Sequence, residues 1–300
     1  MFVPMQLHLP SPIQQLVEPL YEKMGVEVFV KREDLIHPLI SGNKWRKLKY
    51  TLNKAADEGK QHVVTFGGAY SNHVLATAVA AKALSLQASA IIRGEEQQNE
   101  VLNYCKLAGM KLYFVDRLSY TDKKGCIERF FKGNTAIFVI PEGGASPEGV
   151  KGCKEILGEN NETFDHIFCA AGTGTTAAGL YSYIQKNKLN TTLHVVPVLK
   201  SGDFIRNELA KHISIKEQLE LHTGYHFGGY AKHSPALIDF MNDCYKKMEL
   251  PLDFVYTAKL VYGVEDLATN GKFDPTSKIL IIHSGGLQGN RSFKKGTLIF

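Results

Sequence analysis

Short apolar runs alternate with helical patterns along most of this chain of 300 residues. Several runs are apolar throughout, which is typical of strands covered on both faces. Strands are expected at residues 26–31, 62–66, 88–93, 111–115, 136–141, 165–171, 193–199 and 278–284. Helices are expected between them, among others at 72–85, 97–108, 175–188 and 234–248. The alternation predicts an α/β fold with parallel sheets, and it leaves open whether there is one large sheet or two smaller ones.

Four of the expected strands end in turns of small residues. The turns read GGAYSN, PEGGAS, GTGTT and GGLQG. In open parallel sheets, ligands bind beyond the carboxyl ends of the strands, and glycine lets a ligand approach the backbone closely. One such turn is ordinary loop chemistry, but four together predict a ligand crevice.

The turn GTGTT follows a buried strand and opens a helix, which predicts an anion site for a phosphate group. Free N–H groups at the helix start and three threonine hydroxyls would bind it. The residues concerned are Gly172, Thr173, Gly174, Thr175 and Thr176. The same letters also satisfy the loose dinucleotide pattern G-x-G-x-x-G/A, so a nicotinamide oxidoreductase is an alternative. That alternative requires an acidic residue after the next strand, where the chain reads VPVLKSG instead.

The segment SGNKWRKLKY, residues 41–50, holds four basic residues and begins an expected helix that ends at Gly59. Ser41 or Asn43 can cap this helix. At 100° per residue, Lys44 lies at the edge of an apolar arc formed by Trp45, Leu48, Leu52, Ala55 and Ala56. Burial there would favour the neutral, nucleophilic amine. The alternative is a side-chain stem along the apolar surface with its ammonium in water.

Of the other basic residues of this helix, Lys49 borders the arc, whereas Arg46, Lys47 and Lys54 fall outside it and are expected on a solvated face.

Two further segments carry candidate polar groups. GGAYSNH places Ser71, Asn72 and His73 at a helix start, where Ser71 is either an N-cap or a group that binds or attacks a substrate. GYHFGGYAK and VYTAKLVYG show neither helical nor alternating order. Their residues Tyr230 and Tyr256 either pack with one hydroxyl partner or act as proton donors in the crevice.

Composition limits the class of protein. The apolar content of 44% and the charged content of 22% are typical of a globular protein, and the formal charge of +5 is spread along the chain, which does not suggest a nucleic-acid partner. The five cysteines lack the spacing of a metal site, so no bound metal is expected. Their number and separation are typical of a protein in the reducing cytoplasm, which is the expected location. The sequence predicts no signal peptide and no membrane span.

Taken in order, the segments SGNKWRKL, GGAYSNH, PEGGAS, AAGTGTTAAGL, HFGGYAK, VYTAKLVYG and IHSGG resemble a known family. It is the family of pyridoxal-phosphate enzymes that comprises D-cysteine desulfhydrase and 1-aminocyclopropane-1-carboxylate (ACC) deaminase, within the tryptophan-synthase-β-like, fold type II group. The resemblance covers the chain from KREDL at residues 31–35 to the last strand.

The resemblance implies two open α/β domains with pyridoxal 5'-phosphate in the cleft between them. A large domain of residues 1–47 and 153–300 would contain a small inserted domain of residues 48–152. Lys44 would form the Schiff base, residues 172–176 would hold the phosphate, and Asn72 would face the cofactor's 3′ oxygen. The family also suggests a homodimer.

The resemblance further assigns the substrate side of the cleft to Asn43, Ser71, Asn72, His73, Tyr230 and Tyr256. Ser71 would bind the substrate carboxylate or act on the substrate. The family's ACC deaminases carry Glu and Leu where this chain has Thr257 and Ser284. A carboxylate would strengthen the electron sink by keeping the pyridine nitrogen protonated, and a hydroxyl cannot supply that charge.

The two hydroxyls therefore favour β-elimination from a small D-amino acid such as D-cysteine, giving pyruvate, ammonia and sulfide. ACC deaminase is the alternative, followed by an eliminase for D-serine or β-chloro-D-alanine. A binding protein without catalysis on the same scaffold is also consistent with the sequence.

Overall fold

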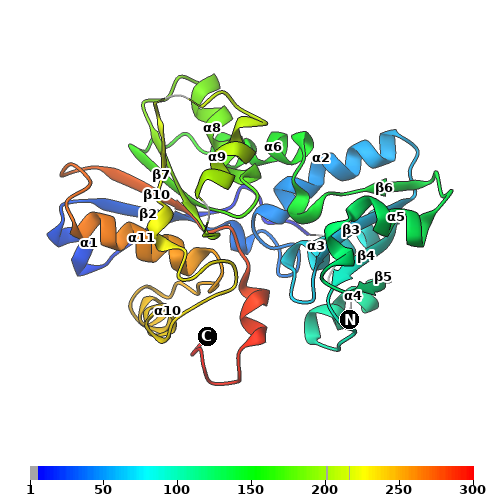
Figure 1. The fold of residues 1–300 in the computed structure, drawn as a ribbon. Coiled ribbons are helices and arrows are strands. Elements are labelled where there is room, and N and C mark those ends of the chain that lie inside the picture. Colours follow the sequence, from blue (N-terminus) through cyan, green and yellow to red (C-terminus); the bar gives the residue numbers. More distant parts are fainter. Residues whose placement is uncertain (1–5, 201, 216) are drawn as a thin grey trace.

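The computed structural model describes residues 6–200, 202–215 and 217–300. The prediction of no signal peptide rests partly on residues 1–5, which lie outside the described residues. The chain contains two separate sheets, which Figure 1 shows in two halves of the molecule. This answers the question that the strand pattern left open.

The larger sheet has six strands, of which the first is antiparallel to its neighbour and the others run parallel. In spatial order they are β1 (Ile13–Leu16), β2 (Glu27–Lys31), β10 (Lys278–Ile282), β7 (His166–Ala171), β8 (Thr192–Pro197) and β9 (Leu219–Leu221). Helices cover both faces, so alternate residues of β7 enter different cores: Phe168 and Ala170 on one side, Ile167 and Cys169 on the other.

One face of this sheet packs against α1 (Pro19–Lys23), α10 (Pro235–Met248) and α11 (Thr257–Thr269). The other face packs against α6 (Pro147–Cys153), α7 (Glu155–Gly158), α8 (Thr175–Lys186) and α9 (Gly202–Ala210). The sheet is thus the middle of three layers, as its apolar strands predict.

The smaller sheet has four parallel strands in the order β5 (Lys111–Val115), β4 (Gln87–Arg93), β3 (His62–Gly68) and β6 (Ile137–Val139). The helices α2 (Asn43–Asp57), α3 (Asn72–Ala83) and α4 (Glu100–Leu107) contribute to the core on one face, and α5 (Lys123–Phe131) covers the other. All four strands lie within residues 48–152, but α2 crosses the first boundary expected for the small domain, and the exact boundaries remain a prediction.

Short 3₁₀ helices connect several elements, at Glu33–Leu35, Ser119–Thr121, Glu142–Gly144, Thr223–Tyr225 and Leu287–Ser292. The strands and helices expected from the sequence are present with small shifts at their ends. The short strands β1 and β9 were not expected. The segment from residue 255 to 263, expected to lack helical order, contains the start of α11 at Thr257.

The basic helix α2 departs from its prediction in several respects. Gly42 precedes it, and no side chain caps it. Ala56, expected on the apolar arc, is exposed, whereas Arg46 and Lys47, expected on a solvated face, are buried. A helical projection cannot show that acidic partners come from distant segments. The guanidinium of Arg46 lies 2.9 Å from Glu33 Oε1 and donates to Glu159 Oε2 at 2.8 Å.

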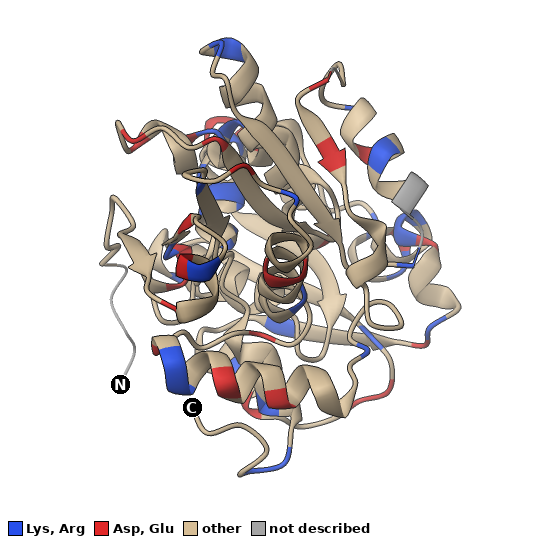
Figure 2. Ribbon diagram, turned by 90° about the vertical axis from the view of Figure 1, so that its left-hand side faces the viewer, with Lys and Arg blue, Asp and Glu red and all other residues tan. Residues whose placement is uncertain are grey.

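Basic and acidic residues are interspersed along the ribbon in the view of Figure 2. Lys54 follows its prediction, because it is exposed and pairs with Glu148 at 2.7 Å. Among the described residues, none of the helices is long and apolar enough to cross a membrane.

Candidate active site

A cavity of about 810 Å³ lies where strands of both sheets end. Its wall includes the carboxyl ends of β3, β4 and β7 and the segment that follows β10. The structure brings almost all the expected site residues to this cavity: Asn43, Lys44, Ser71, Asn72, His73, Gly172, Thr173, Gly174, Thr176, Tyr230, Tyr256 and Ser284. Thr175 and Thr257 are buried and do not line it. The glycine turns thus form one crevice, as predicted.

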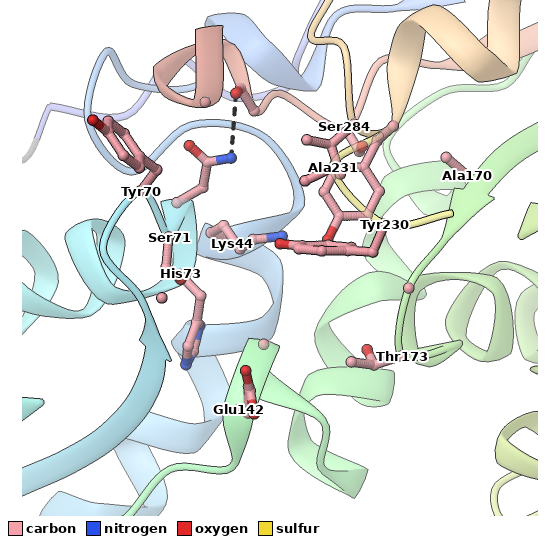
Figure 3. Close-up of a pocket in the computed structure, with 18 of the residues that line it drawn as sticks. Lys44, Tyr70, Ser71, His73, Glu142, Ala170, Thr173, Tyr230, Ala231 and Ser284 are labelled. Carbon is pink, nitrogen blue, oxygen red and sulfur yellow. Dashed lines mark hydrogen bonds between the residues drawn. The ribbon is translucent and has the colours of Figure 1, made fainter. Parts of the chain in front are cut away.

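Lys44 reaches into this cavity from the first turn of α2, between Ser71 and His73 on one side and Tyr230 on the other (Figure 3). Its Nζ donates to Asn43 Oδ1 at 2.7 Å and lies 5.9 Å from the centre of the Tyr256 ring. Burial, with a smaller contribution from the ammonium of Lys47, lowers the pKa of Lys44 from 10.5 to about 7. A large fraction of the amine is therefore neutral near neutral pH, which a lysine nucleophile requires.

The tight approach of α2 to the other half of the site depends on Gly42. This residue has φ of 66°, and a Cβ placed on it would lie 1.8 Å from the carbonyl oxygen of Ser284. Only glycine fits such a contact at positive φ. The N–H of Asn43 donates to that same carbonyl at 3.2 Å. The backbone thereby holds Lys44 beside the segment after β10.

The start of α8 has the features of an anion site. Gly174 precedes it with φ of 73°, and no side chain caps the helix. Its first N–H groups are therefore available to a ligand on the cavity side. Thr176 Oγ1 accepts from Asn43 Nδ2 at 2.8 Å, and the hydroxyls of Thr173 and Thr175 lie 3.0 Å apart. A phosphate at this position would complete the helix start.

Ser71 caps α3, because its Oγ accepts from the N–H of Val74 at 3.3 Å. Next to it, Asn72 Nδ2 donates to the carbonyl of Gly286 at 3.2 Å. The Oδ1 atom of Asn72 is buried and has no hydrogen-bond partner among the described residues. A buried acceptor without a donor is costly, so this atom fits a ligand that supplies one.

His73 lies on the same wall. Its Nε2 is 2.8 Å from the hydroxyl of Thr65, which itself donates to the carbonyl of Ile140. We therefore assign the ring proton to Nε2, which leaves Nδ1 as an acceptor with no partner in the described part of the chain. Burial first, then the charges of Lys44 and Lys47, lower the pKa of His73 to about 3. This imidazole is a neutral acceptor.

Tyr230 and Tyr256 lie on the opposite wall, with ring centres 6.2 Å apart at an interplanar angle of 74°. Burial raises the pKa of both phenols, that of Tyr256 well above its ordinary value. Both hydroxyls therefore remain protonated and can donate a hydrogen bond. A Cβ on Gly172 would lie 3.3 Å from the Tyr256 ring, so glycine at this position leaves room for that ring.

Ser284 and Thr257 have different surroundings. Ser284 lines the cavity, whereas the hydroxyl of Thr257 donates to Asp253 Oδ1 at 2.9 Å. Asp253 is fully buried and also accepts from the N–H groups of Val255, Tyr256 and Thr257. It fixes the start of α11 and with it the position of Tyr256. Asp253 was not among the predicted site residues, although it lies two residues before the segment VYTAKLVYG.

Other cavity residues were also missed, among them Lys47, Arg93, Glu142 and His233. Arg93 ends an expected strand and Glu142 lies in the PEGGAS turn, so their places at strand ends were an available signal. Lys47 was hidden by its place on the polar side of the helical projection. It donates to the carbonyl of Gly143 at 3.2 Å.

A neutral lysine, an uncapped helix start and unpartnered acceptors define a site for a phosphorylated carbonyl cofactor. The family profile described as "Pyridoxal-phosphate dependent enzyme" matches residues 5–285. The chain belongs to this family of pyridoxal-phosphate-dependent enzymes, and its cofactor is pyridoxal phosphate. The site residues described above fit that group. This assignment replaces the nicotinamide alternative that the GTGTTA letters had left open.

Curated relatives include a putative 1-aminocyclopropane-1-carboxylate deaminase of Pyrococcus horikoshii, which is 33% identical over 93% of this chain and 90% of that protein. A bifunctional D-cysteine desulfhydrase/1-aminocyclopropane-1-carboxylate deaminase of Arabidopsis thaliana is 28% identical over 94% of this chain and 77% of that protein. A D-cysteine desulfhydrase of Yersinia enterocolitica is also 28% identical, over 92% of this chain and 91% of that protein.

Solved structures agree with the fold. The crystal structure of an ACC deaminase homologue superposes with a TM-score of 0.82 at 31% identity, over 96% of this chain and 92% of that one. A fungal L-serine ammonia-lyase from Rhizomucor miehei has a TM-score of 0.70 at 16% identity, over 93% and 94% of the two chains. The second likeness concerns the fold alone.

Proposed function

We propose that this enzyme eliminates sulfide from D-cysteine, and that water then completes the reaction to pyruvate and ammonia. The observation that carries the proposal is the pair of hydroxyl residues, Ser284 and Thr257, at the two positions where the family's ACC deaminases are expected to carry Leu and Glu. Ser284 lies on the cavity wall, and the buried hydroxyl of Thr257 donates a hydrogen bond to Asp253.

The distribution of carboxylates supports this choice. Among the described residues that line the cavity, Glu142 alone carries a carboxylate, and it belongs to the small-sheet side, within the PEGGAS turn. A hydroxyl beside the cofactor's pyridine ring leaves the ring a weaker electron sink than a carboxylate would. Elimination from an amino acid that has an acidic Cα proton requires a weaker electron sink than ring opening does. ACC has no Cα proton and requires the opening of a ring.

The proposal gives the following roles to residues of the site. Pyridoxal phosphate, when bound, supplies the electron sink for the carbanion at Cα. Lys44, neutral near pH 7, is the base that removes the Cα proton. Ser71 and the N–H groups at the start of α3 face the substrate carboxylate. Tyr256, held protonated by burial, is placed to give a proton to the leaving sulfur.

Cofactor binding in this proposal uses the groups that lack partners. The start of α8 and its threonines hold the phosphate through residues 172–176. Asn72, whose buried Oδ1 lacks a partner among the described residues, would bind the 3′ oxygen of the cofactor. His73 is a neutral acceptor close to the substrate side.

ACC deaminase is the second candidate, because the first relatives given above carry that name. Elimination from D-serine or β-chloro-D-alanine would use the same groups with a different leaving atom. A protein that binds the cofactor without catalysis would form the imine yet release no keto acid.

A panel of substrates tests the proposal. Purified protein with pyridoxal phosphate is given D-cysteine, L-cysteine, ACC, D-serine and β-chloro-D-alanine, and pyruvate, 2-oxobutanoate and sulfide are measured. We expect D-cysteine to give pyruvate and sulfide in equal amounts. Lys44→Ala should abolish the reaction, and Lys54→Ala, an exposed lysine of the same helix, should leave it unchanged. A preference for ACC would overturn the proposal.

Three further expectations belong to the proposal. The protein would be a cytoplasmic homodimer, as the family suggests. The small domain would comprise residues 48–152 and the large one residues 1–47 and 153–300. Sedimentation equilibrium tests the homodimer, and limited proteolysis tests the domain boundaries.

A further inference from the structure

A polar cluster lies on one face of the large sheet, outside the cavity. His194 on β8 pairs in register with Glu220 on β9, and His222 follows two residues later. Side chains two apart on a strand share a face, and paired residues of neighbouring strands do so too. His166 joins the same face from β7, because it lies two residues before Phe168, the partner of His194. The register alone thus brings three histidines and a glutamate together.

The side-chain atoms of this cluster are close enough to share one ion. His194 Nδ1 lies 2.9 Å from His222 Nε2 and 3.6 Å from Glu220 Oε2, and the distance from His222 Nε2 to Glu220 Oε2 is 3.7 Å. A triangle with these three sides has a circumradius of about 2.0 Å, which is the length of a zinc bond to nitrogen or oxygen. A metal close to the centre of this triangle would have bonds of ordinary length to all three atoms.

The surroundings suit a metal ligand as well. The outer nitrogen of His194, Nε2, lies 3.0 Å from His166 Nδ1, which is the contact that orients a ligating imidazole from behind. The His194 ring stacks on Phe168 at 4.3 Å between ring centres.

One cation already faces the cluster. Lys272 Nζ lies 2.9 Å from Glu220 Oε2, the same oxygen that completes the triangle. Both of these side chains are partly exposed, and His222 is near the surface, so the site has a path to solvent. None of the cluster residues lines the catalytic cavity.

We propose that His194 Nδ1, His222 Nε2 and Glu220 Oε2 bind a divalent ion of the zinc type, with a fourth position open to water. The ion would replace the proton between the two imidazoles and would draw Glu220 away from Lys272. It would join β8 to β9 at the edge of the sheet, and its role would be structural, because it lies outside the catalytic cavity.

Zinc binding by the full-length protein with its cofactor tests the proposal. After chelator treatment and dialysis, zinc is added alone, without amino-acid substrate, and bound metal is measured by equilibrium dialysis and mass spectrometry. We expect one zinc per chain, a rise in Tm with zinc, and visible bands of a four-coordinate site when cobalt replaces zinc. Lys44→Ala should bind the same amount, which separates this site from the cofactor.

Matched variants locate the ion. Glu220→Gln and His222→Asn, both partly exposed, should each weaken zinc binding at least about tenfold. His8→Asn, an exposed histidine elsewhere, should not. Lys272→Met should strengthen binding, because it removes the competing ammonium, which an adventitious surface site would not show. A wild-type chain that binds no zinc, or variants of Glu220 and His222 that bind it as well as wild type, would overturn the proposal.

Discussion

The pKa of Lys44 gives a prediction that depends only on the structure of the cofactor-free protein. At a pKa of about 7, half of this amine is neutral at pH 7, whereas a lysine at the ordinary 10.5 is neutral in roughly one molecule in three thousand. Burial should therefore raise the supply of reactive amine by about three orders of magnitude near pH 7. The rate of imine formation should rise with pH and level off above about 7.5, once the amine is mostly neutral.

Stopped-flow absorbance measures this rate when apoprotein is mixed with pyridoxal phosphate between pH 5.5 and 10. Dividing each rate by the rate of a blocked free lysine at the same pH, expressed per neutral amine, removes the titration of the cofactor itself and leaves that of Lys44. Lys44→Ala provides the background from other lysines. A midpoint that follows the free lysine would refute the argument that burial controls this amine.

A second variant separates the effect of burial on the pKa of Lys44 from the effect of the neighbouring Lys47 charge. Lys47→Met removes the nearby charge but leaves Lys44 mostly buried. The pH midpoint of imine formation should therefore move upward and remain below 10.5. An unchanged midpoint would mean that Lys47, whose own pKa burial lowers, is already neutral and exerts no repulsion.

Three further predictions concern the scaffold. Arg46→Met leaves the fully buried Glu33 without its guanidinium partner and should lower the free energy of unfolding in urea by about 3–5 kcal/mol, whereas Lys54→Met at the surface should change it little. Equal costs would contradict the role given to burial. Ser71→Ala should cost about 1 kcal/mol through the lost cap and should also lower D-cysteine turnover, whereas Ser71→Thr should restore the stability; full activity in the alanine variant would exclude a substrate role. Burial raises the pKa of Glu265 to about 7, so folding binds its proton more tightly, and that stabilisation is lost as pH rises from about 4.5 to 7. Glu265→Gln should therefore gain stability over wild type across this pH range and keep a constant advantage above it, and a constant difference at every pH would contradict the shift.

Much of the fold could be predicted because its strands are long apolar runs with glycine turns at their ends. The two strands that were missed are short, and β1 reads IQQL, with two polar residues in four. The start of α11 was missed because Asp253, which accepts from three backbone N–H groups there, stands outside the aromatic segment. Local pattern shows neither long-range pairing nor a cap several residues away.

The site was predictable to a similar extent and for related reasons. Its glycine turns and Lys44 follow from strand ends and from one helical projection, and the resemblance supplied the chemistry. The burial of Arg46 and Lys47 could not be foreseen, because Glu159 lies 113 residues from Arg46 and the carbonyl of Gly143 lies 96 residues from Lys47. The engagement of Thr257 by Asp253 likewise appears only in three dimensions.

The choice of substrate is tested most directly by kcat/KM for D-cysteine and for ACC on one preparation of the protein with its cofactor. Pyruvate and 2-oxobutanoate are separated and measured in the same assay. The hydroxyls at Ser284 and Thr257 predict that D-cysteine exceeds ACC by at least an order of magnitude and that Lys44→Ala loses both activities. A higher value for ACC would contradict the account.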